Sequence, residues 1–346
     1  MIELSFSLVP SYPLARYVDV IARAGRQGFD RLWVPDQGFH RDPFVALAAV
    51  GMRTEAMELG IAVTNVFTRH PVQIARVAAA LGELRPSGIA LGLGAGERRV
   101  RDAVGAADAR FVEVTRQGIV AMRRLLAGET VTMKNDAFVL AEVKLEFTPS
   151  GRVSFYVAST ARSAFRMAGA VADGVIIGDM ADPTAIRSVV AEVQAGAREA
   201  GRDPRDVKIV CWTTTICTDE RASVLELMRR RLLPVAIATM SEYSRMLIGV
   251  DGRDYDVIAQ AFKERAPVSG QTLTDELVDR VALVGSGARI AERILELEAA
   301  GVDMIGMRMP GALLGLVDFE ANLERLGAEV APIVKSAANN RHAHHG

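Results

Sequence analysis

The chain has 346 residues, half of them apolar, and a formal net charge of −1. That length and apolar content suit one large core, such as a barrel, or two smaller domains. The 41 basic and 42 acidic residues are spread along the chain, so neither a nucleic-acid footprint nor a membrane-binding surface is expected. No apolar run approaches the roughly 20 residues that cross a bilayer, and the strand-like N-terminus lacks the plan of a signal peptide. Cys211 and Cys217 are interpreted as buried thiols, and we expect a cytoplasmic protein.

Short β-rich apolar runs alternate with amphipathic helical runs along the whole chain. We expect strands at 2–9, 31–35, 58–64, 88–94, 153–158, 173–178, 207–217 and 303–308. We expect helices at 13–27, 43–55, 71–85, 109–127, 161–170 and 182–200. An interrupted helical stretch follows at 219–300, and a last helix at 318–338 closes the chain. Eight strands, each followed by a helix, are the number that closes a (β/α)₈ TIM barrel. The sequence therefore predicts an α/β fold with a single barrel domain over 1–338 and a disordered tail over 339–346.

Two segments interrupt this rhythm. Residues 128–150 alternate apolar and polar side chains around Lys134-Asn135-Asp136, which predicts an exposed β-hairpin insertion. Residues 241–285 are variable helical material, which predicts a helical insertion at the rim of the barrel. This insertion is either a lid over the site or structural padding.

Two predicted helices are apolar over much more than one face. They cover residues 43–52 and 71–81. A helix with one face on a barrel and the other in water would be amphipathic instead. We therefore expect these helices to be buried against a second copy of the chain, in a homodimer or a higher homo-oligomer.

The carboxyl ends of the predicted strands carry the candidate site. In TIM-barrel enzymes the active site lies at these ends. Here the strands pass from apolar to polar residues at that end, which predicts a polar ring around a small-molecule site. The ring consists of Ser7, Asp36, Gln37, Thr64, Asn65, Gly94, Gly96, Glu97, Ser159, Thr160, Gly178, Asp179, Thr213–Thr215 and Arg308.

The glycine-rich run Gly92–Glu97 differs from a dinucleotide fingerprint, because its third glycine falls one residue early. Close approach of the backbone to a flat ring, with Glu97 projecting over that ring, fits the pattern better. Glu97 is either a solvated loop carboxylate or a general acid, and Asp36 has the same two interpretations. His40 and His70 have no second ligand at metal spacing, so no metal site is expected.

Three blocks of sequence resemble the luciferase-like (β/α)₈ superfamily. They are WVPDQ at 33–37, VTNVFTRHP at 63–71 and LGLGAGE at 91–97. More narrowly, they resemble the methylenetetrahydromethanopterin reductase branch, whose members use the deazaflavin coenzyme F420. The resemblance continues through 168–175 and 284–287 and covers essentially the whole chain. Its blocks are more specific for the superfamily than for the cofactor.

The resemblance implies roles for individual residues. The strand end at 62–65 would form a bulge behind the deazaflavin ring, with a non-prolyl cis peptide placed at Ala62–Val63. Glu97 would relay a proton, and Asp36 and Gln37 would orient the ring or the substrate. Ser159, Thr160 and the amides of the helix that follows would bind the cofactor phosphate, since a helix N-terminus favours an anion. The implied cofactor-binding residues are Ala62, Val63, Thr64, Asn65, Gly94, Gly96, Ser159, Thr160, Arg162 and Gly178.

The chain departs from the reductases at three places. Gln37 stands where the reductases often have histidine, and Ser7 stands where they have glutamate. These two changes leave the pterin substrate open. Ala161-Arg162 replaces a Gly-Pro pair, so Arg162 would supply charge to the phosphate in place of a tight turn.

Three functions fit these residues. The first is an oxidoreductase that uses F420 to transfer a hydride to or from an electrophilic C=N or C=C substrate. The second is an FMN-dependent monooxygenase on the same barrel, which would use reduced flavin and oxygen. The third is a non-catalytic flavin-binding barrel. The first two are chemically exclusive, because deazaflavin has carbon in place of the ring nitrogen and reacts poorly with oxygen. The sequence leaves the substrate and the reaction direction open.

Overall fold

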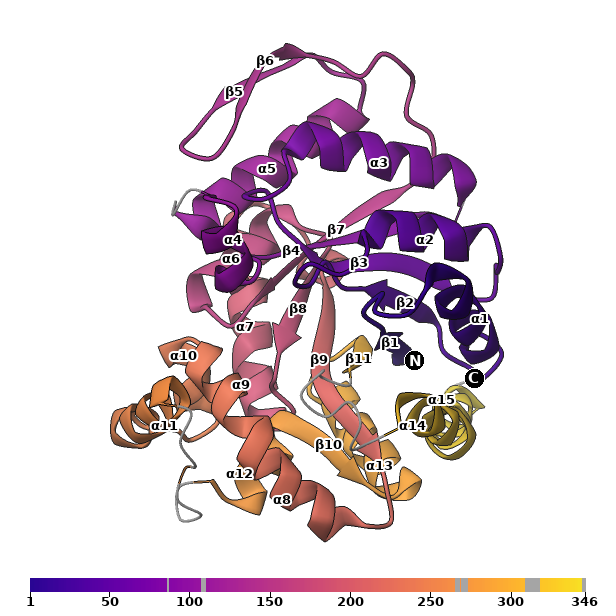
Figure 1. Cartoon of the computed structure of the whole chain (residues 1–346), viewed down its shortest axis with the longest axis vertical. Coiled ribbons are helices and arrows are strands. Elements are labelled where there is room, and N and C mark those ends of the chain that lie inside the picture. The colour runs from indigo at the N-terminus through magenta and orange to yellow at the C-terminus, as the bar shows by residue number, and fades with distance from the viewer. Residues whose placement is uncertain (86, 107–109, 265–267, 269–272, 309–317, 344–346) are drawn as a thin grey trace.

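The computed structural model describes residues 1–85, 87–106, 110–264, 268, 273–308 and 318–343. Eight parallel strands close into a barrel, and β11 pairs back to β1 (Figure 1). All eight overlap the ranges expected from the sequence, so the predicted TIM barrel is confirmed. In order around the barrel they are β1 (Glu3–Ser7), β2 (Arg31–Val34), β3 (Glu58–Thr64), β4 (Ile89–Leu93), β7 (Val153–Ser159), β8 (Gly174–Gly178), β9 (Lys208–Cys217) and β11 (Met304–Arg308).

Helices surround the barrel, and several begin where the sequence supplies a cap. Asp42 accepts hydrogen bonds from the N–H groups of Phe44 (2.9 Å) and Val45 (3.1 Å), and Pro43 occupies the first helical position of α2. Among the described residues, no helix is both long and apolar enough to cross a bilayer. The first group of helices is α1 (Leu14–Ala24), α2 (Pro43–Gly51), α3 (Pro71–Leu84), α4 (Arg98–Ala103), α5 (Phe111–Leu126), α6 (Arg162–Val171) and α7 (Pro183–Glu199). The second is α8 (Arg221–Arg231), α9 (Leu233–Thr239), α10 (Glu242–Leu247), α11 (Gly252–Glu264), α12 (Asp275–Val281), α13 (Gly287–Ala299), α14 (Phe319–Arg325) and α15 (Ala331–Ala343).

The C-terminal helix α15 runs further than expected. Residues 339–343, which we predicted to begin a disordered tail, continue this helix to Ala343. Residues 344–346 of that tail lie outside the described residues.

The hairpin insertion is confirmed. Strands β5 (Val131–Lys134) and β6 (Val139–Val143) pair antiparallel beside α3 and α5 (Figure 1). Asn135 closes the turn, since its side-chain oxygen accepts hydrogen bonds from the N–H groups of Ala137 (2.8 Å) and Phe138 (2.9 Å).

The described residues of 241–285 are largely helical, as predicted, in α10, α11 and α12, but the helical material ends before the predicted bound at 285. Residues Ala282–Gly285 form β10, which pairs parallel with the carboxyl half of β9, from Ala282 opposite Thr214 onward. This strand has four residues and follows α12 directly, so its apolar run is continuous with the buried face of that helix. A strand of that length has no periodicity of its own that a sequence window can detect. Residues 265–267 and 269–272 of the insertion lie outside the described residues.

Three aromatic rings pack inside the barrel, together with aliphatic side chains such as Ile176 and Val210. The Trp33 ring centroid lies 5.4 Å from that of Tyr156 and 6.2 Å from that of Trp212. Each of the three rings packs against a glycine of the neighbouring strand. A Cβ atom at that glycine would lie within 2.6 Å of a carbon of the ring. These glycines are Gly60 against Trp33, Gly174 against Tyr156 and Gly306 against Trp212. Trp212 pairs with Gly178, the last residue of β8, so it lies toward the carboxyl end of the barrel, where the site is expected.

Candidate active site

A pocket of about 440 Å³ opens where five barrel strands end. Its walls come from β3, β7, β8 and β9, from the loop after β4, and from the C-terminal end of α9. Most of the lining is small or apolar, which suits a flat organic ring more than a charged ligand. The lining residues are Ala62, Val63, Ala95, Phe111, Ala158, Ser159, Thr160, Ala161, Ile176, Gly178, Trp212, Thr239, Met240 and Ser241.

The β3 wall of this pocket is a bulge. The pairing of β3 with β4 shifts register between Ile61 and Thr64, and the Ala62–Val63 peptide bond is cis, at the position expected from the sequence. Gly94 lies against the bulge. A Cβ atom there would be 3.2 Å from Cγ2 of Val63 and 3.3 Å from the carbonyl oxygen of Ala158. The glycine thus lets the ends of β3, β4 and β7 approach each other closely.

The carboxylate of Asp36 is held by protein groups beside the pocket. Its Oδ2 accepts hydrogen bonds from Thr64 Oγ1 and Arg69 Nε, both at 2.8 Å. Arg69 also contacts Asp42 at 2.7 Å and lies over the Phe44 ring. Burial would lower the pKa of Arg69, but the hydrogen bonds and charges of the two aspartates outweigh it, and the pKa is raised. Asp36 therefore joins the loops that follow β2 and β3.

Asn65 organises the turn after β3. Its side-chain oxygen accepts hydrogen bonds from the N–H groups of Phe67 (3.0 Å) and Thr68 (2.8 Å), and the residue is 5% exposed. Gly96 packs against it with a φ of 71°, and a Cβ atom there would lie 2.6 Å from Asn65 Nδ2. Position 96 requires glycine both for its backbone conformation and for this contact.

Glu97 connects two loops at the barrel mouth. Its Oε1 accepts a hydrogen bond from the N–H of Gly38 at 3.2 Å, and its Oε2 lies 3.6 Å from Arg99 Nη2. The side chain is 35% exposed, and Gln37, next to Gly38, is exposed as well. Glu97 follows the pocket residue Ala95 by two positions, so the acid lies next to the pocket and stays open to solvent.

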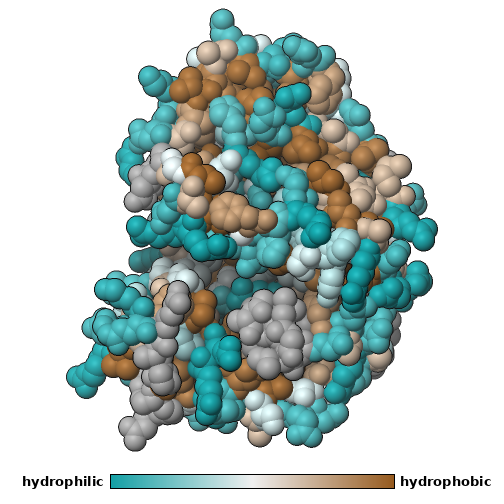
Figure 2. Space-filling view, in the orientation of Figure 1, coloured by the Kyte–Doolittle hydropathy of each residue, from teal (hydrophilic) through white to brown (hydrophobic). Residues whose placement is uncertain are grey.

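The residues expected at the phosphate are engaged with protein groups. Ser159 Oγ accepts a hydrogen bond from the N–H of Ala161 at 3.0 Å, and Thr160 Oγ1 accepts one from the N–H of Ser241 at 2.9 Å. Arg162 donates to Glu192 at 2.8 Å and points into a neighbouring hollow between α6 and α10, visible as a notch in the surface (Figure 2). The first N–H groups of α6 have no intrahelical acceptor, as at any helix start, and the residues at this start, Ala161–Ser163, line the hollow.

The sequence profile described as luciferase-like monooxygenase matches residues 4–304. The chain belongs to this family. It is 30% identical over 299 residues to the 5,10-methylenetetrahydromethanopterin reductase of Methanolobus tindarius, covering 86% of this chain and 91% of that protein. It is also 30% identical over 198 residues to the F420-dependent glucose-6-phosphate dehydrogenase of Microbacterium testaceum, covering 53% of this chain and 59% of that protein.

Solved structures of other enzymes share this family fold. The coenzyme F420-dependent tetrahydromethanopterin reductase from Methanopyrus kandleri superposes with a TM-score of 0.80 at 19% identity, over 96% of this chain and 99% of that chain. An F420-dependent secondary alcohol dehydrogenase, solved with an F420–acetone adduct, gives 0.74 at 18% identity, with the same two coverages. At these identities the likeness establishes the fold alone.

The family barrel brings some predicted residues to the pocket and leaves others beside it. Ala62, Val63, Ser159, Thr160 and Gly178 line the pocket. Asp36, Thr64, Asn65, Gly96 and Glu97 form a connected group at the ends of β2, β3 and β4, outside that lining. Gly94 packs behind the bulge, and Arg162 lies in the adjacent hollow.

Three features of this family member were not assigned a role from sequence. Arg69 pairs with Asp36, although it lies within one of the motifs that carried the resemblance. Trp212 lines the pocket from the middle of an apolar strand, and apart from its size no feature of the sequence distinguishes it as a site residue. Asp179 pairs with Arg308 across β9, near Trp212 and Thr214. Both members of this last pair were expected on the rim, but a contact between residues 129 positions apart has no local signal.

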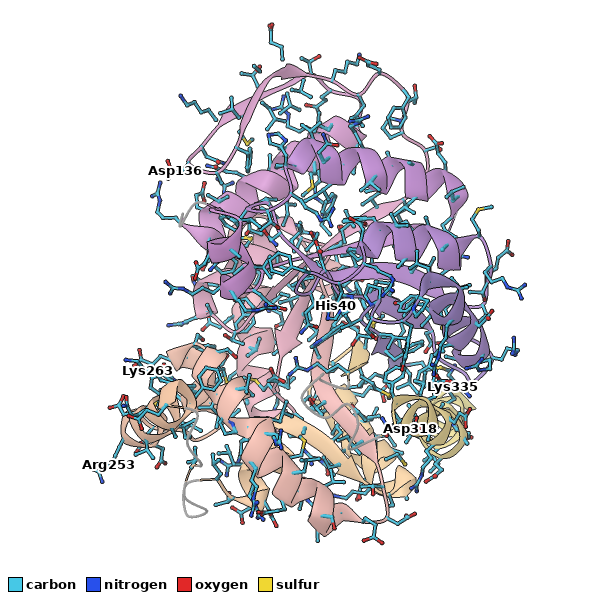
Figure 3. All side chains as sticks on the ribbon, in the orientation of Figure 1. His40, Asp136, Arg253, Lys263, Asp318 and Lys335 are labelled. Carbon is cyan, nitrogen blue, oxygen red and sulfur yellow. The ribbon has the colours of Figure 1, made fainter. Side chains whose placement is uncertain are left out.

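His40 and His70, the two histidines whose side chains the structure describes, have a surface and a structural position. His70 caps α3, since its Nδ1 accepts a hydrogen bond from the N–H of Val72 at 3.3 Å. His40 is exposed on the loop that contacts Glu97, near the middle of the view in Figure 3. In the part of the chain that the structure describes, no group of three or more His, Cys, Asp or Glu is placed to hold a metal ion.

Proposed function

We propose that this chain is an F420-dependent oxidoreductase that transfers a hydride between the deazaflavin and an electrophilic C=N or C=C substrate. The observation that carries the proposal is the largely apolar pocket against the β3 bulge, at the carboxyl ends of the barrel strands. The names of the similar proteins support the choice of cofactor, since the reductases and dehydrogenases among them act with F420.

The pocket residues fit a tricyclic ring. The walls at Ala62, Ala95 and Ala158 carry one-carbon side chains, which leaves width for a planar group. A Cβ atom added at Gly178 would meet nothing closer than Thr160 Cγ2 at 3.9 Å, so a larger side chain there would extend into the pocket. Val63, Ala62 and Gly94 would support the ring from the β3 side. Ser159 and the free N–H groups at the start of α6 would hold the phosphate.

When bound, F420 supplies the redox chemistry, and the protein supplies position, desolvation and a proton. The apolar walls, including Ile176 and Trp212, would exclude water from the reacting carbon. Glu97 would exchange a proton with the substrate, because it is the carboxylate beside the pocket that keeps solvent access. Gln37, carried on the loop that Glu97 holds, would orient the substrate. Asp36 would act through Arg69 and Thr64, by fixing the bulge.

The test is to titrate the purified protein with oxidised F420 and with FMN, followed by fluorescence. We expect saturable binding of F420 and, without oxygen, reoxidation of the reduced cofactor by imine or enone acceptors. Gly178→Leu should abolish F420 binding, because its side chain would occupy the pocket. Gly252→Leu is the matched control, since its Cβ meets nothing within 4 Å. Equal F420 affinity in both variants would exclude this pocket as the cofactor site.

The same titration tests the FMN-dependent monooxygenase. Tight FMN binding together with oxygen consumption by the reduced flavin would overturn the F420 proposal in favour of that rival. Failure of both cofactors to bind would favour a non-catalytic barrel.

We also propose that the protein is a homodimer, or a higher homo-oligomer, through α2 and α3. A hollow of about 380 Å³ runs between these helices and is lined largely by apolar side chains, including Phe44, Ile74 and Leu81. Val45 and Leu84 at this surface are 55% and 46% exposed, and Figure 2 shows hydrophobic surface where Figure 1 draws the two helices. A second copy placing the same helices there would bury both surfaces at once.

Sedimentation tests the assembly. Val45→Asp should shift the protein to monomer, whereas Val257→Asp on α11, which replaces a similarly exposed valine, should not. A monomeric wild-type protein at working concentration would end the proposal.

Finally, we propose a cytoplasmic location. Cys211 and Cys217 are both free and buried. Burial raises the pKa of each thiol to about 12, with a further contribution at Cys217 from the neighbouring Glu329, so neither thiol is activated for disulfide exchange. Cell fractionation tests this, and recovery outside the cytoplasm would contradict it.

A further inference from the structure

The mouth of the barrel has a second group of polar residues, next to the pocket described above but outside its lining. Arg308 ends β11, and Asp179 follows β8. The strand between them, β9, contributes Thr214, whose Cα pairs in register with that of Arg308. Met304 and the glycine at 306 face the barrel interior, so alternation along β11 turns Arg308 inward as well.

Asp179 reaches Arg308 through an unusual backbone conformation. Its φ is 52°, in the left-handed region that few residues other than glycine adopt. Its N–H donates to the carbonyl oxygen of Trp212 at 2.9 Å, which fixes this conformation. The carboxylate Oδ1 then accepts a hydrogen bond from Arg308 Nη2. Arg308 is 26% exposed and Asp179 18%, so the pair is shielded but within reach of a ligand.

The hydrogen bonding of this pair is incomplete. Among the described residues, Arg308 Nε and Thr214 Oγ1 are buried and have no hydrogen-bond partner. Thr214 is fully buried. Buried donors without acceptors are uncommon in native proteins, because each loses its hydration without replacement. Arg308 and Thr214 are paired across neighbouring strands, and each has one such atom. We infer that a polar group of a ligand supplies the missing hydrogen-bond partners.

Arg69, at the same end of the barrel, shows what a complete arrangement looks like. It binds two carboxylates, those of Asp36 and Asp42, through Nε and Nη2. Arg308 binds one carboxylate, and its Nε is left over. The planar guanidinium fork matches a second carboxylate in geometry and in charge.

We propose that Arg308 and Thr214 form a subsite for a carboxylate on the substrate, with Asp179 holding the guanidinium in place. This inference rests on the proposed function, which it makes more specific. The reducible C=C or C=N bond would lie over Trp212, the pocket residue between Asp179 and Thr214, and the substrate would be an unsaturated or imino acid. Arg308 would thus determine substrate specificity.

The test uses two small probes of nearly equal shape, crotonate and its uncharged amide, with inorganic phosphate as a third. Binding is measured by calorimetry on the protein with and without F420. We expect crotonate to bind more tightly than crotonamide and phosphate. Arg308→Met should weaken crotonate by about tenfold or more, the effect of losing one charge-assisted hydrogen bond, and leave crotonamide unchanged. Thr214→Val should weaken crotonate less.

Two further variants keep the proposal falsifiable. Arg98→Met removes an arginine that is 80% exposed near the same rim and should bind like wild type. Asp179→Asn keeps an oxygen that can accept from Arg308 Nη2, so the guanidinium stays in place while the competing charge is removed, and crotonate should bind more tightly. Weaker binding of crotonate to this variant would contradict the proposal. Equal preference for crotonate in wild type and Arg308→Met, or tighter binding of phosphate, would overturn the carboxylate subsite.

These outcomes separate the two proposals. If F420 fails to bind while crotonate binding still depends on Arg308, the proposed function fails and the subsite stands. If F420 binds and Arg308→Met changes nothing, the subsite alone is lost.

Discussion

The two ends of the barrel both carry shielded arginines, and they use them differently. At the amino end, Arg31 is 8% exposed and all three of its guanidinium nitrogens have partners: Nε and Nη2 donate to Glu58, and Nη1 donates to the Tyr156 hydroxyl at 3.2 Å. At the carboxyl end, one nitrogen of Arg308 bonds Asp179, and Nε is buried without a partner. An arginine whose hydrogen-bond donors all have protein partners stabilises the fold. An arginine with an unsatisfied donor can still bind a ligand.

The surroundings of the two arginines strengthen the contrast. Burial alone would lower the pKa of Arg31, but the contacts with Tyr156 and Glu58 outweigh it and raise the pKa. The Trp33 ring lies 5.0 Å from the guanidinium carbon, so the cation also has an aromatic face against it. The amino end is therefore closed by packing. The carboxyl end holds its charges on loops and strand ends, where Glu97 and Arg308 are partly exposed.

The largest expected effect is on turnover, at the carboxyl end. Glu97→Gln should lower the turnover of reduced F420 by about 10²-fold, because the amide cannot exchange a proton. The amide oxygen can still accept the hydrogen bond from Gly38, so F420 affinity and stability should stay near wild type. Glu97→Ala, which also releases that loop, should raise KM as well. Steady-state kinetics check both variants, and unchanged turnover in Glu97→Gln would remove this acid from the chemistry.

The next effect is on stability, at the amino end. Arg31→Met should cost about 3 kcal/mol of unfolding free energy, the lower end of the range for breaking a buried pair, because Glu58 is half exposed. The same change at Arg308 should cost less, about 1–2 kcal/mol, because it removes an unsatisfied donor along with one hydrogen bond, although it leaves Asp179 without its cation. Denaturant titration measures both. Equal losses at the two arginines would abolish the distinction between the ends.

A smaller loss should follow from filling the glycine positions that face the interior rings. Gly174→Ala would place a methyl group 2.3 Å from the Tyr156 ring and 2.8 Å from the carbonyl oxygen of Lys208. Overpacking of this kind costs about 1–3 kcal/mol. Gly252→Ala on α11, where nothing lies within 4 Å, should be neutral or slightly stabilising. A denaturation midpoint for Gly174→Ala equal to that of wild type would show that the interior can rearrange.

The features predicted from sequence are those that one segment determines. Buried parallel strands are continuous apolar runs, so all eight barrel strands were located, and the hairpin has its turn residues at Asn135. The cis bond at Ala62–Val63 was placed through the resemblance, which carries positional information that composition lacks. The strand at 282–285 was missed because four apolar residues after a helix are not distinguishable from one more helical turn.

The partners of the site residues could not be predicted. The motifs supplied Asp36 and Glu97, but not that Asp36 bonds the end of β3 at Thr64 or that Glu97 bonds the loop after β2 at Gly38. Those bonds depend on how strand ends converge in three dimensions, and residue identity does not encode the resulting distances. For the same reason, the unpaired Nε of Arg308 is visible only once the strands are in register.

The smallest expected effect is at Asp36, where it distinguishes a structural role of the carboxylate from direct contact with the cofactor. In Asp36→Asn, the side chain keeps an oxygen that can accept from Thr64 and Arg69, and Arg69 keeps Asp42 at 2.7 Å and the Phe44 ring at 5.1 Å. The loss of one charge from a network that retains its other members should therefore cost about 1 kcal/mol of unfolding free energy. Because Asp36 bonds the bulge through Thr64 and lies outside the pocket lining, F420 affinity should fall by less than about threefold, within that same cost. A large loss of affinity with unchanged stability would instead mean that this carboxylate contacts the ring directly, and the carboxyl end would then hold a second ligand-binding charge besides Arg308.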